Sequence, residues 1–290
     1  MPSKKYTIKW RMFKDTLFLA LQKILPQAYL SRLAGKLLNC ENSSIKDKLI
    51  NFAIKRFKID LSDALVENPK LYTSFTSFFT RKLKPEARQI DQNYKSIISP
   101  ADGKITQAGQ ITEGKLIQAK GKRFSLRALT AGTAKENYTD FSVIYLSPSD
   151  YHRVHMPMDG SLIRMIYIPG KLFSVNELAA ENIDGLFAKN ERLLCYFKTA
   201  IGEVAVIFVG ALIVAGIETV WHKLVAPNYY SKITHFDYQT KNIYFNKGAE
   251  IGLFNFGSTI ITLFPENKVS WQENVLGKVN MGEAIALMVI

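Results

Sequence analysis

The sequence predicts an α+β protein in which basic amphipathic helices at the N terminus precede a mainly antiparallel, barrel- or sandwich-like β domain. Over residues 8–60, apolar side chains recur at spacings of three and four, which is the helical period. After Ile90, short runs rich in Ile, Val, Tyr and Phe alternate with Gly, Pro, Asn and Asp, which is typical of strands and turns. The change falls between residues 60 and 70, so we divide the chain into a helical region, 1–66, and a β-rich domain, 67–290.

Four helices are expected in the first part of the chain. The first covers about 8–25 and ends at Pro26, the second runs near 28–38, and the third covers about 44–57. A short fourth helix is expected over 71–83. The chain has 290 residues, 47% of them hydrophobic, which is enough to bury one large core or two small ones.

Six stretches have the composition of strands. They are 97–105, 115–119, 141–146, 161–168, 193–199 and 204–214. The last one belongs to the longest apolar run, Val204 to Ile217, whose fourteen residues fall short of the roughly twenty that span a bilayer. We interpret this run as two buried strands joined by a tight turn at Gly210, and we expect no membrane-spanning helix.

The net charge of +13 is concentrated near the N terminus. Residues 1–60 hold thirteen Lys and Arg against four Asp and Glu, which indicates a polyanionic partner, either nucleic acid or an anionic membrane surface. Basic helices with Trp and Phe on their apolar side are typical of a membrane interface. The sequence has no zinc ligands, RNP-type aromatics or helix-turn-helix spacing, so no nucleic-acid partner is expected. The alternative is a helical subdomain packed on the rest of the protein, with a solvated charged face.

Two further features concern the compartment. Cys40 and Cys195 are too few for a disulfide framework and lack metal-ligand spacing, which fits a reducing environment. No secretory signal is expected, because the apolar stretch Leu17–Leu21 is short and is soon followed by Lys23.

A strand-like stretch, Phe254–Leu263, is broken by Gly257, Ser258 and Thr259. A glycine inside a strand pattern marks a bulge or a close backbone approach. Because Gly257 has no Cβ, the Ser258 hydroxyl can reach its carbonyl, and the backbone there can take a conformation that other residues resist. The alternative is an ordinary bulged strand.

Other candidate groups are two histidines and one aspartate. His152 and His155 follow Ser147–Asp150, where one helical turn is expected, and Asp102 lies in a Pro/Gly turn. The histidines lack a nearby third ligand, so no metal is expected. Asp102, His155 and Ser258 together supply an orienting carboxylate, a base and a nucleophile. A plain serine hydrolase is not favoured because the Gly-x-Ser-x-Gly elbow is absent, and each group taken alone also fits a structural role.

Several segments spread over nearly the whole chain form a specific set. They are Phe78-Phe79-Thr80-Arg81 with Leu83-Lys84 and Arg88, Pro100-Ala101-Asp102-Gly103, Leu146 to Pro157, Leu172 to Asn176, Asn190-Glu191-Arg192, Val209-Gly210-Ala211, Ile217 to Trp221, and Gly257-Ser258-Thr259. With this set the chain resembles the phosphatidylserine decarboxylases, pyruvoyl-dependent enzymes of phospholipid synthesis. The family usually has Leu where this chain has Phe256, and the exchange keeps the side chain apolar.

The resemblance implies a proenzyme, or zymogen, that cuts itself between Gly257 and Ser258. In such enzymes the base, here His155, takes the proton of the serine, and the aspartate, here Asp102, orients the imidazole. The Ser258 oxygen then attacks the Gly257 carbonyl and forms an ester. β-Elimination and hydrolysis convert the serine into the cofactor, a covalent pyruvoyl group.

The products implied are a β chain, 1–257, and an α chain, 258–290. The two are expected to stay together as a heterodimer because the strand at 260–263 belongs to the sheet. In the implied reaction the pyruvoyl group forms a Schiff base with phosphatidylserine, releases carbon dioxide and yields phosphatidylethanolamine. The enzyme is thus a carboxy-lyase whose catalytic domain is the β-rich part.

The resemblance also suggests further roles. His152 is expected to donate a proton or to position the substrate carboxylate, and Phe173 and Ser174 are expected to lie in a loop that contacts substrate. Similar bacterial enzymes are peripheral proteins of the cell membrane, on its cytoplasmic side, and often dimerise further. Phosphatidylserine and the anionic membrane surface are therefore the expected partners.

Two other functions compete with this one. A pyruvoyl decarboxylase of a soluble amino acid would act on free serine or another amino acid without lipid, and it leaves the basic helices unexplained. A non-enzymatic membrane-binding protein would carry the three residues of the triad by accident.

Overall fold

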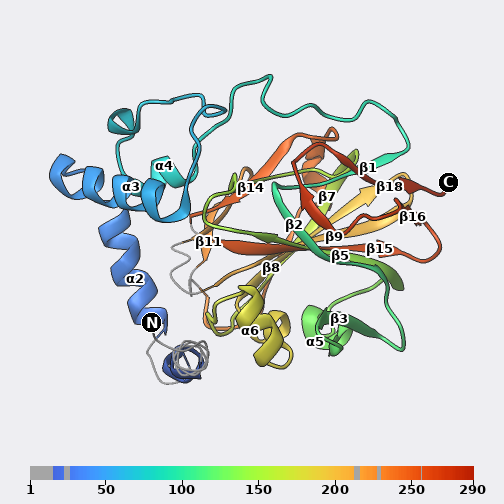
Figure 1. The fold of residues 1–290 in the computed structure, drawn as a ribbon. Coiled ribbons are helices and arrows are strands. Elements are labelled where there is room, and N and C mark those ends of the chain that lie inside the picture. Colours follow the sequence, from blue (N-terminus) through green and yellow to red (C-terminus); the bar gives the residue numbers. More distant parts are fainter. Residues whose placement is uncertain (1–15, 23–26, 212–215, 227–229, 256) are drawn as a thin grey trace, which may run out of the picture.

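A computed structural model describes residues 16–22, 27–211, 216–226, 230–255 and 257–290. A group of helices lies at one end of a body built from antiparallel sheets (Figure 1). The predicted α+β class is confirmed, and the β part is sandwich-like. Among the described strands the largest sheet stays open, so the barrel alternative is wrong.

The N-terminal helices follow the apolar periodicity of the sequence. Residues 16–22 are helical, and α2 (Gln27–Leu38) and α3 (Ser43–Phe57) follow. The Asn42 side chain starts α3 by accepting the Ser44 N–H at 3.0 Å. The second and third predicted helices are therefore confirmed to within one residue. Most of the first prediction lies outside the described residues.

The helix predicted over 71–83 is wrong. Two short elements, η1 (Pro69–Leu71) and α4 (Phe75–Phe79), take its place. The Ser74 side chain accepts the backbone N–H of Ser77 at 3.1 Å, and the Ser77 hydroxyl accepts the backbone N–H of Ser74 at 3.0 Å. This capping box begins a new helix at Phe75, because its hydrogen bonds satisfy the first backbone donors there.

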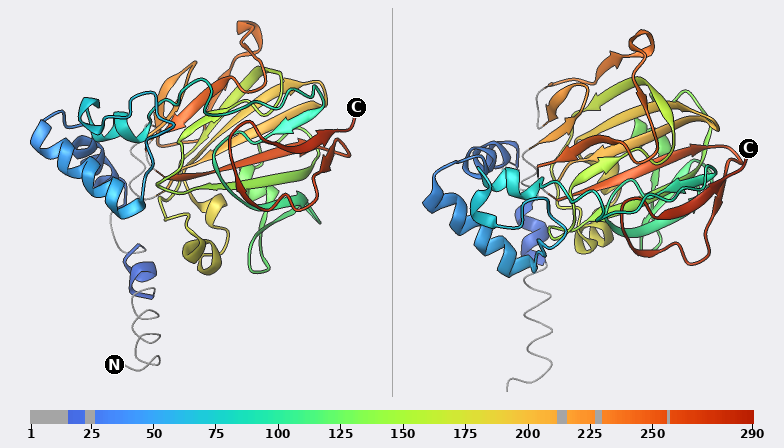
Figure 2. Two further views of the ribbon diagram at one scale, coloured as in Figure 1. Left: turned by 45° about the horizontal axis from the view of Figure 1, so that its top comes forward. Right: turned by 90° about the horizontal axis from the view of Figure 1, so that it is seen from above.

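The helical group has its own small core. Its buried members are Leu38, Ile50, Ala53, Ile59, Tyr72, Phe75, Phe78 and Phe79. This core includes α4 and so continues past residue 66. The proposed division at 66/67 stays a prediction, and η1 and α4 pack with the helices that precede them. Figure 2 shows from two further sides that α2 and α3 lie beside the sheets.

The largest sheet has nine described strands, and every pair in it is antiparallel. Its order is β12-β7-β8-β9-β15-β5-β2-β17, with β13 also beside β7. The bounds are β2 (Gly103–Gln110), β5 (Tyr138–Leu146), β7 (Gly160–Ile168), β8 (Arg192–Thr199), β9 (Gly202–Val209), β12 (Thr234–Asp237), β13 (Tyr244–Phe245), β15 (Ser258–Pro265) and β17 (Gly277–Val279). The strands predicted at 141–146, 161–168 and 193–199 are confirmed to within three residues.

Three smaller sheets and three short helices complete the described body. The four-stranded sheet β11-β10-β14-β6 comprises β6 (Arg153–His155), β10 (Ile217–Thr219), β11 (Lys223–Ala226) and β14 (Glu250–Phe254). The others are β1 (Ser96–Ile98), β18 (Ala284–Met288) and β16 (Val269–Trp271), and the hairpin of β3 (Lys115–Ala119) and β4 (Lys122–Ser125). The helices are α5 (Leu126–Thr130), α6 (Glu177–Asn182) and α7 (Leu186–Lys189). The strand predicted at 115–119 is confirmed as β3.

Three local predictions need correction. The strand expected over 97–105 is broken by a turn, because the Ser99 hydroxyl donates to the Ala101 carbonyl at 2.7 Å and separates β1 from β2. The strand expected over 204–214 ends at Val209, and residues 212–215 lie outside the described part. Residues 147–150 form a turn instead of a helical turn, and the chain then runs extended into β6.

Two strand pairs change sheets at the same place. In one sheet β14 pairs with β6, whereas their chain neighbours β15 and β5 pair in the other. The chain therefore passes between these sheets twice, once over the connection 147–152 and once over the connection between Phe254 and Ser258. Three candidate residues named from the sequence lie here: His152 and Gly257 in these connections, and Ser258 at the first residue of β15. Asp102, His155, Phe173 and Ser174 lie elsewhere.

Gly103 is required where the turn enters β2. Its φ is +154°, and a Cβ added there would overlap the carbonyl oxygen of Tyr145 on the neighbouring strand. Gly109 on the same strand has a φ of +139° with open space around it. Both substitutions to Ala strain the backbone, but Gly103→Ala must also push β5 away. We expect it to lower the unfolding free energy by about 1–3 kcal/mol more than Gly109→Ala, measured by urea denaturation. Equal losses would contradict this assignment.

Candidate active site

Ser258 is the first residue of β15 and lies opposite Leu146, the last residue of β5. It is fully buried, and its Oγ has no hydrogen-bond partner among the described residues. Gly257 precedes it, and a Cβ added to Gly257 would lie 3.6 Å from the Leu146 carbonyl oxygen. The prediction that glycine is needed here for an unusual conformation stays a prediction.

His152 lies in the adjacent connection and is fully buried. Its Nδ1 is 2.8 Å from the carbonyl oxygen of Asp150, and its ring centroid is 4.1 Å from that of Phe79. Because a carbonyl only accepts, Nδ1 carries the proton, and Nε2 holds a lone pair without a partner among the described residues. Burial lowers the pKa of His152 to about 3, and the charge of nearby Arg81 adds to this. His152 is thus neutral and has one unused acceptor.

His155 ends β6 with both ring nitrogens engaged. Its Nδ1 donates to the Gly248 carbonyl at 2.7 Å, and its Nε2 lies 3.1 Å from the Tyr151 hydroxyl, which donates to it. Burial lowers the pKa of His155, while the hydrogen bond to Gly248 and the charges of Glu250 and Asp102 oppose that effect. A neutral imidazole with its lone pair on Nε2 is the form that can accept a proton.

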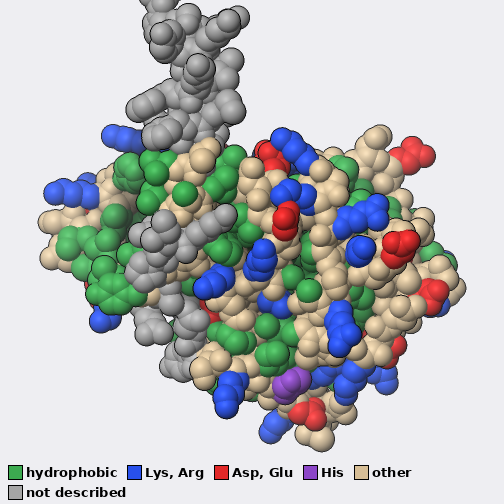
Figure 3. Space-filling model, turned by 90° about the horizontal axis from the view of Figure 1, so that it is seen from below, with side chains coloured by type: hydrophobic (Ala, Val, Ile, Leu, Met, Phe, Trp, Pro, Cys, Tyr) green, Lys and Arg blue, Asp and Glu red, His purple; other side chains and the backbone are tan. Residues whose placement is uncertain are grey.

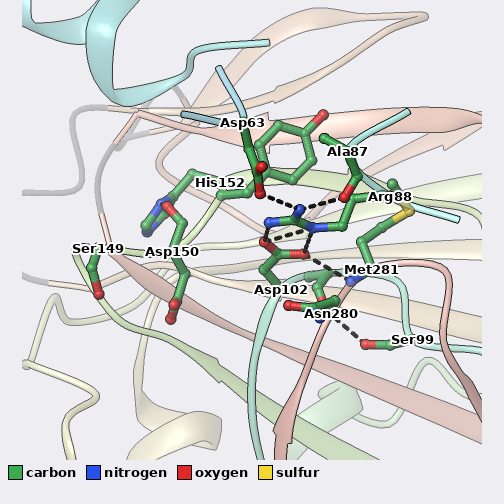
Figure 4. Close-up of polar contacts among 12 residues, drawn as sticks. Asp63, Ala87, Arg88, Ser99, Asp102, Ser149, Asp150, His152, Asn280 and Met281 are labelled. Atoms are coloured by element: carbon green, nitrogen blue, oxygen red, sulfur yellow. Dashed lines mark hydrogen bonds and ion pairs between the residues drawn. The ribbon is translucent and has the colours of Figure 1, made fainter. Parts of the chain in front are cut away.

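Asp102 is buried and forms an ion pair with Arg88. The guanidinium donates from Nε at 2.9 Å and from a terminal nitrogen at 2.6 Å, and its other terminal nitrogen reaches Asp63 at 2.8 Å (Figure 4). The Met281 N–H donates a further bond to Asp102 at 2.8 Å. The hydrogen bond to Asp102 is the largest cause that raises the pKa of Arg88. The carboxylate is thus held in place by one side chain and one backbone donor.

The structure brings the predicted triad into one region without joining its members. None of the described hydrogen bonds links Asp102 to His155 or His155 to Ser258. Instead, Gly248 orients the imidazole and Arg88 holds the carboxylate. The roles assigned to Asp102, His155 and Ser258 therefore stay predictions. His152 and His155 lie on extended chain three residues apart, so their side chains point to opposite sides and not along one helix face.

A polar pocket with a volume of about 500 Å³ is lined by Asp102 and by Tyr151, which precedes His152 in the chain. It lies between the helical group and the sheets, and its charged lining is Lys58, Asp60, Asp63, Arg81, Arg88, Asp102, Asp150 and Lys278. Arg81 is buried, and burial lowers its pKa. One of its terminal nitrogens donates to the Ser149 carbonyl at 3.0 Å. Burial raises the pKa of Asp150. Positive and negative groups alternate here, which suits a ligand that carries both charges.

The predicted substrate loop is fixed by an amide side chain. Asn190 is buried, and its Oδ1 accepts the Phe173 N–H at 3.1 Å while its Nδ2 donates to the Phe173 carbonyl at 2.8 Å. The same Nδ2 donates to the Gly210 carbonyl at 2.8 Å. Phe173 is buried and Ser174 is partly exposed. Their contact with substrate stays a prediction.

Sequence reasoning gave no role to four residues of this region. Arg81 and Arg88 belong to the first segment of the quoted set, Tyr151 belongs to the histidine segment, and Gly248 was not singled out at all. The sequence did contain a signal for the two arginines. Both belong to the specific set of segments, and charged residues in such a set are expected to bind fixed partners. Gly248 acts through its backbone carbonyl, which no side-chain pattern reveals. Within the described residues, no cluster of three or more His, Cys, Asp or Glu is placed to hold a metal ion.

The comparisons with known proteins agree on one family. A family model described as phosphatidylserine decarboxylase matches residues 75–287, and another described as PSD matches residues 17–58. A phosphatidylserine decarboxylase proenzyme of Francisella philomiragia is 57% identical over 263 residues, which cover 90% of this chain and 94% of that protein. A proenzyme of the same description from Francisella tularensis subsp. novicida is 54% identical over 279 residues, covering 94% and 99%.

These matches span both the helical group and the β-rich part. A buried serine hydroxyl directly after a glycine, with the buried neutral His152 in the adjacent connection, is the arrangement expected of an enzyme that modifies its own chain. The chain belongs to the phosphatidylserine decarboxylase family.

The buried neutral state of His152 predicts a pH dependence of stability. Its pKa is about 3 in the folded protein against 6.5 for the ordinary group. Between these values the unfolded chain binds more protons, so this stability is complete above pH 6.5 and is lost as the pH falls. We expect His152 alone to lower the unfolding free energy by about 1.4 kcal/mol per pH unit within that window, in urea denaturation of a Ser258→Ala chain.

The matched comparison uses two histidine variants in the same background. His152→Gln should flatten the dependence, whereas His235→Gln, which alters an exposed side chain, should leave it unchanged. An equally steep dependence in both variants contradicts the assignment.

Proposed function

We propose that the chain is a self-processing decarboxylase that uses its own Ser258 to make its reactive group. It is a phosphatidylserine decarboxylase produced as a proenzyme, which its family and the names of its relatives support. The observation that carries the proposal within the site is the Ser258 hydroxyl, buried without a partner directly after Gly257. A buried hydroxyl without a hydrogen bond is costly. The hydroxyls of Thr259 and Thr262 on the same strand also lack partners, but of the three only Ser258 directly follows the Gly257 carbonyl.

Chain cleavage starts with a proton transfer. His155 takes the Ser258 proton on Nε2, and for this the Tyr151 hydroxyl must leave Nε2 or pass the proton on. The Ser258 oxygen attacks the Gly257 carbonyl carbon, the carbon–nitrogen bond breaks, and the nitrogen takes a proton, which leaves an ester. Asp102 supports the imidazolium through its charge, held in place by Arg88.

The ester then breaks on its other side. Loss of the Ser258 α-proton and of the Gly257 carboxylate leaves a dehydroalanine, and water converts it into a ketone with release of ammonia. The site fits the product, because Gly257 is free of close contacts and Ser258 is anchored by strand pairing. The resulting pyruvoyl group supplies an electron-withdrawing carbonyl, which is what decarboxylation of an amino acid requires.

The other residues bind and protonate the substrate. The pocket of mixed charge accommodates a headgroup with one ammonium and two anionic groups. His152 offers its unpaired Nε2 on the side of Arg81 and Phe79, where it can accept a hydrogen bond or carry a proton to the substrate carbon. Phe173 and Ser174 form the loop that contacts the substrate.

The two chains stay associated after cleavage. β15 lies between β9 and β5, β17 pairs with β2, and β18 pairs with β1, so the piece 258–290 is held by four sets of backbone hydrogen bonds. The active unit is therefore an α/β heterodimer, and a further dimer of such units is part of the proposal.

Intact-mass measurement tests the cleavage directly. The purified protein should contain two chains that separate only in denaturant, with the smaller one starting at position 258 and blocked by a pyruvoyl group. Ser258→Ala should give one uncut chain without activity. Thr259→Ala, which removes a neighbouring buried hydroxyl on the same strand, is the control and should still be cut.

Three results count against the proposal. An uncut chain that decarboxylates phosphatidylserine at full rate would refute the mechanism. Turnover of free serine at the rate of the lipid would favour the soluble amino-acid decarboxylase. A fully functional membrane-binding protein with Asp102→Asn and His155→Ala would favour the non-enzymatic alternative.

The N-terminal helices form the surface that we propose lies on the membrane. Along α2, the side chains of Tyr29, Leu33 and Leu37 recur every four residues and are 66%, 55% and 48% exposed. Figure 3 shows hydrophobic side chains gathered at the helical end of one face, with Lys and Arg beside them. Apolar side chains that enter the interface and basic ones that meet anionic headgroups both favour binding. No described helix has the length and hydropathy of a membrane span.

We propose that the enzyme is peripheral on the cytoplasmic side of the cell membrane. Lifting a diacyl lipid into water costs about 0.8 kcal/mol for each exposed CH₂. An enzyme that lies on the bilayer avoids most of this cost, because only the headgroup must reach the pocket.

The double variant Leu33→Asp, Leu37→Asp tests this surface. It should lower binding to vesicles containing phosphatidylserine by about tenfold or more, since each buried Leu contributes about 1.5–3 kcal/mol. Sedimentation with vesicles measures the binding, and intact mass checks that processing is preserved. Leu276→Asp, at a site 57% exposed in the β-rich part, is the control and should bind as the parent does. Equal binding by all three proteins contradicts the proposal.

A further inference from the structure

Two glutamines of the helical group are almost completely buried. Gln22 ends the described helical segment 16–22 and is 2% exposed, and Gln27 begins α2 and is 8% exposed. The Gln27 Nε2 donates to the Gln22 carbonyl at 2.6 Å, so the two residues are tied to each other. A glutamine is seldom buried unless its amide has partners, so these side chains have a specific task.

Their remaining contacts reach the loop that carries Phe173 and Ser174. The Gln27 Oε1 accepts the Leu172 N–H at 2.8 Å, and the Gln22 Oε1 accepts the Ser174 N–H at 2.6 Å. These bonds join positions more than 140 residues apart in the sequence. Alternate backbone donors of the loop are thus bound by the N-terminal helices.

The donor between them is bound from the other side. Asn190 of the β-rich part accepts the Phe173 N–H and donates to the Phe173 carbonyl. Three amide side chains therefore fix three consecutive backbone N–H groups. If the helices leave, the N–H groups of Leu172 and Ser174 lose their acceptors, and a buried donor without an acceptor is unfavourable. We therefore expect the loop to lose order when the helices detach, and an ordered loop to favour attached helices.

The same helices carry the surface proposed to lie on lipid. Leu17 and Leu21, on the segment that ends with Gln22, are 45% and 44% exposed. In α2, the exposed side chains of Tyr29, Leu33 and Leu37 follow Gln27. One face thus points to the outside while the two glutamines point to the loop.

We infer that Gln22 and Gln27 are positioning residues that couple contact of the N-terminal helices with the bilayer to order in the loop at 172–174. A bilayer that holds the helices in place stabilises the loop in the conformation in which Phe173 and Ser174 meet the substrate. The inference rests on the proposed function, because it assigns the substrate loop and the membrane surface as proposed above.

The test uses substitutions that keep length and remove the acceptor. Gln22→Met and Gln27→Met, singly and together, are compared with Gln27→Glu, which retains an acceptor oxygen, and with Gln92→Met, whose parent side chain is exposed and bonds only to nearby Ile90. Four readouts are needed: intact mass for processing, sedimentation with phosphatidylserine vesicles, hydrogen exchange of the amides at 172 and 174, and kcat and KM on vesicles.

In the parent, vesicles should slow exchange at residues 172 and 174 by about tenfold or more. The double Met variant should be cut and should bind vesicles as the parent does. It should lose the slower exchange, and its kcat/KM on vesicles should fall by about tenfold. Gln27→Glu should keep most of the protection against exchange at residue 172, whereas Gln27→Met should lose it. If only the bulk of the side chain mattered, the two variants would behave alike.

The outcomes separate the inference from the function on which it rests. Met variants with the exchange and kinetics of Gln92→Met overturn the inference. If the double variant is not cut, the inference is tested by comparing Gln27→Met with Gln27→Glu. Equal hydrogen exchange at residue 172 in these two variants overturns the inference. A parent chain that is neither cut nor active on phosphatidylserine overturns the proposed function instead.

Discussion

The paired crossing between two sheets is the constraint on which the site depends. β14 and β15 are consecutive in the chain but belong to different sheets, and their partners β6 and β5 make the same change beside them. The Phe254 N–H donates to the His152 carbonyl at 3.0 Å, so the two crossings are bonded together. β15 is paired on both sides, which fixes Ser258 more firmly than a loop could. The bond proposed to be cut therefore lies directly before a strand that is paired on both sides.

Around this junction the protein keeps polar groups buried and incompletely paired. The Ser258 Oγ and the His152 Nε2 lack partners among the described residues, whereas Asp102 and His155 are fully engaged by others. Unpaired buried groups lower stability, and natural proteins accept this cost mainly at functional sites. Asp102 and His155 are held by hydrogen bonds with Arg88, Gly248 and Tyr151. The Ser258 hydroxyl and the His152 Nε2 have no such bond to break before they react.

How much the sequence predicted depends on the range of the interaction. Helical period and strand composition are local, and they located α2, α3 and several strands to within a few residues. The helix expected over 71–83 was wrong because one serine cap, at Ser74, overrides the apolar pattern. Asp102, His155 and Ser258 were brought into one region as expected, but their hydrogen bonds were not predictable. Those bonds depend on Arg88 and on the Gly248 carbonyl, which come from distant parts of the chain.

A lipid substrate explains why the helices and the sheets must be built as one unit. The reacting carbon of a phospholipid headgroup is at the bilayer surface, so in the proposed membrane-bound state the site must be presented at a fixed height above the helices. The small helical core contributes apolar contacts, four of its eight buried side chains being aromatic, but the hydrophobic effect behind such contacts is not directional. Hydrogen bonds from Gln22 and Gln27 to the loop backbone are directional and fail over short displacements. In the proposed membrane-bound state, contacts of this kind set the distance between the membrane and the proposed substrate loop.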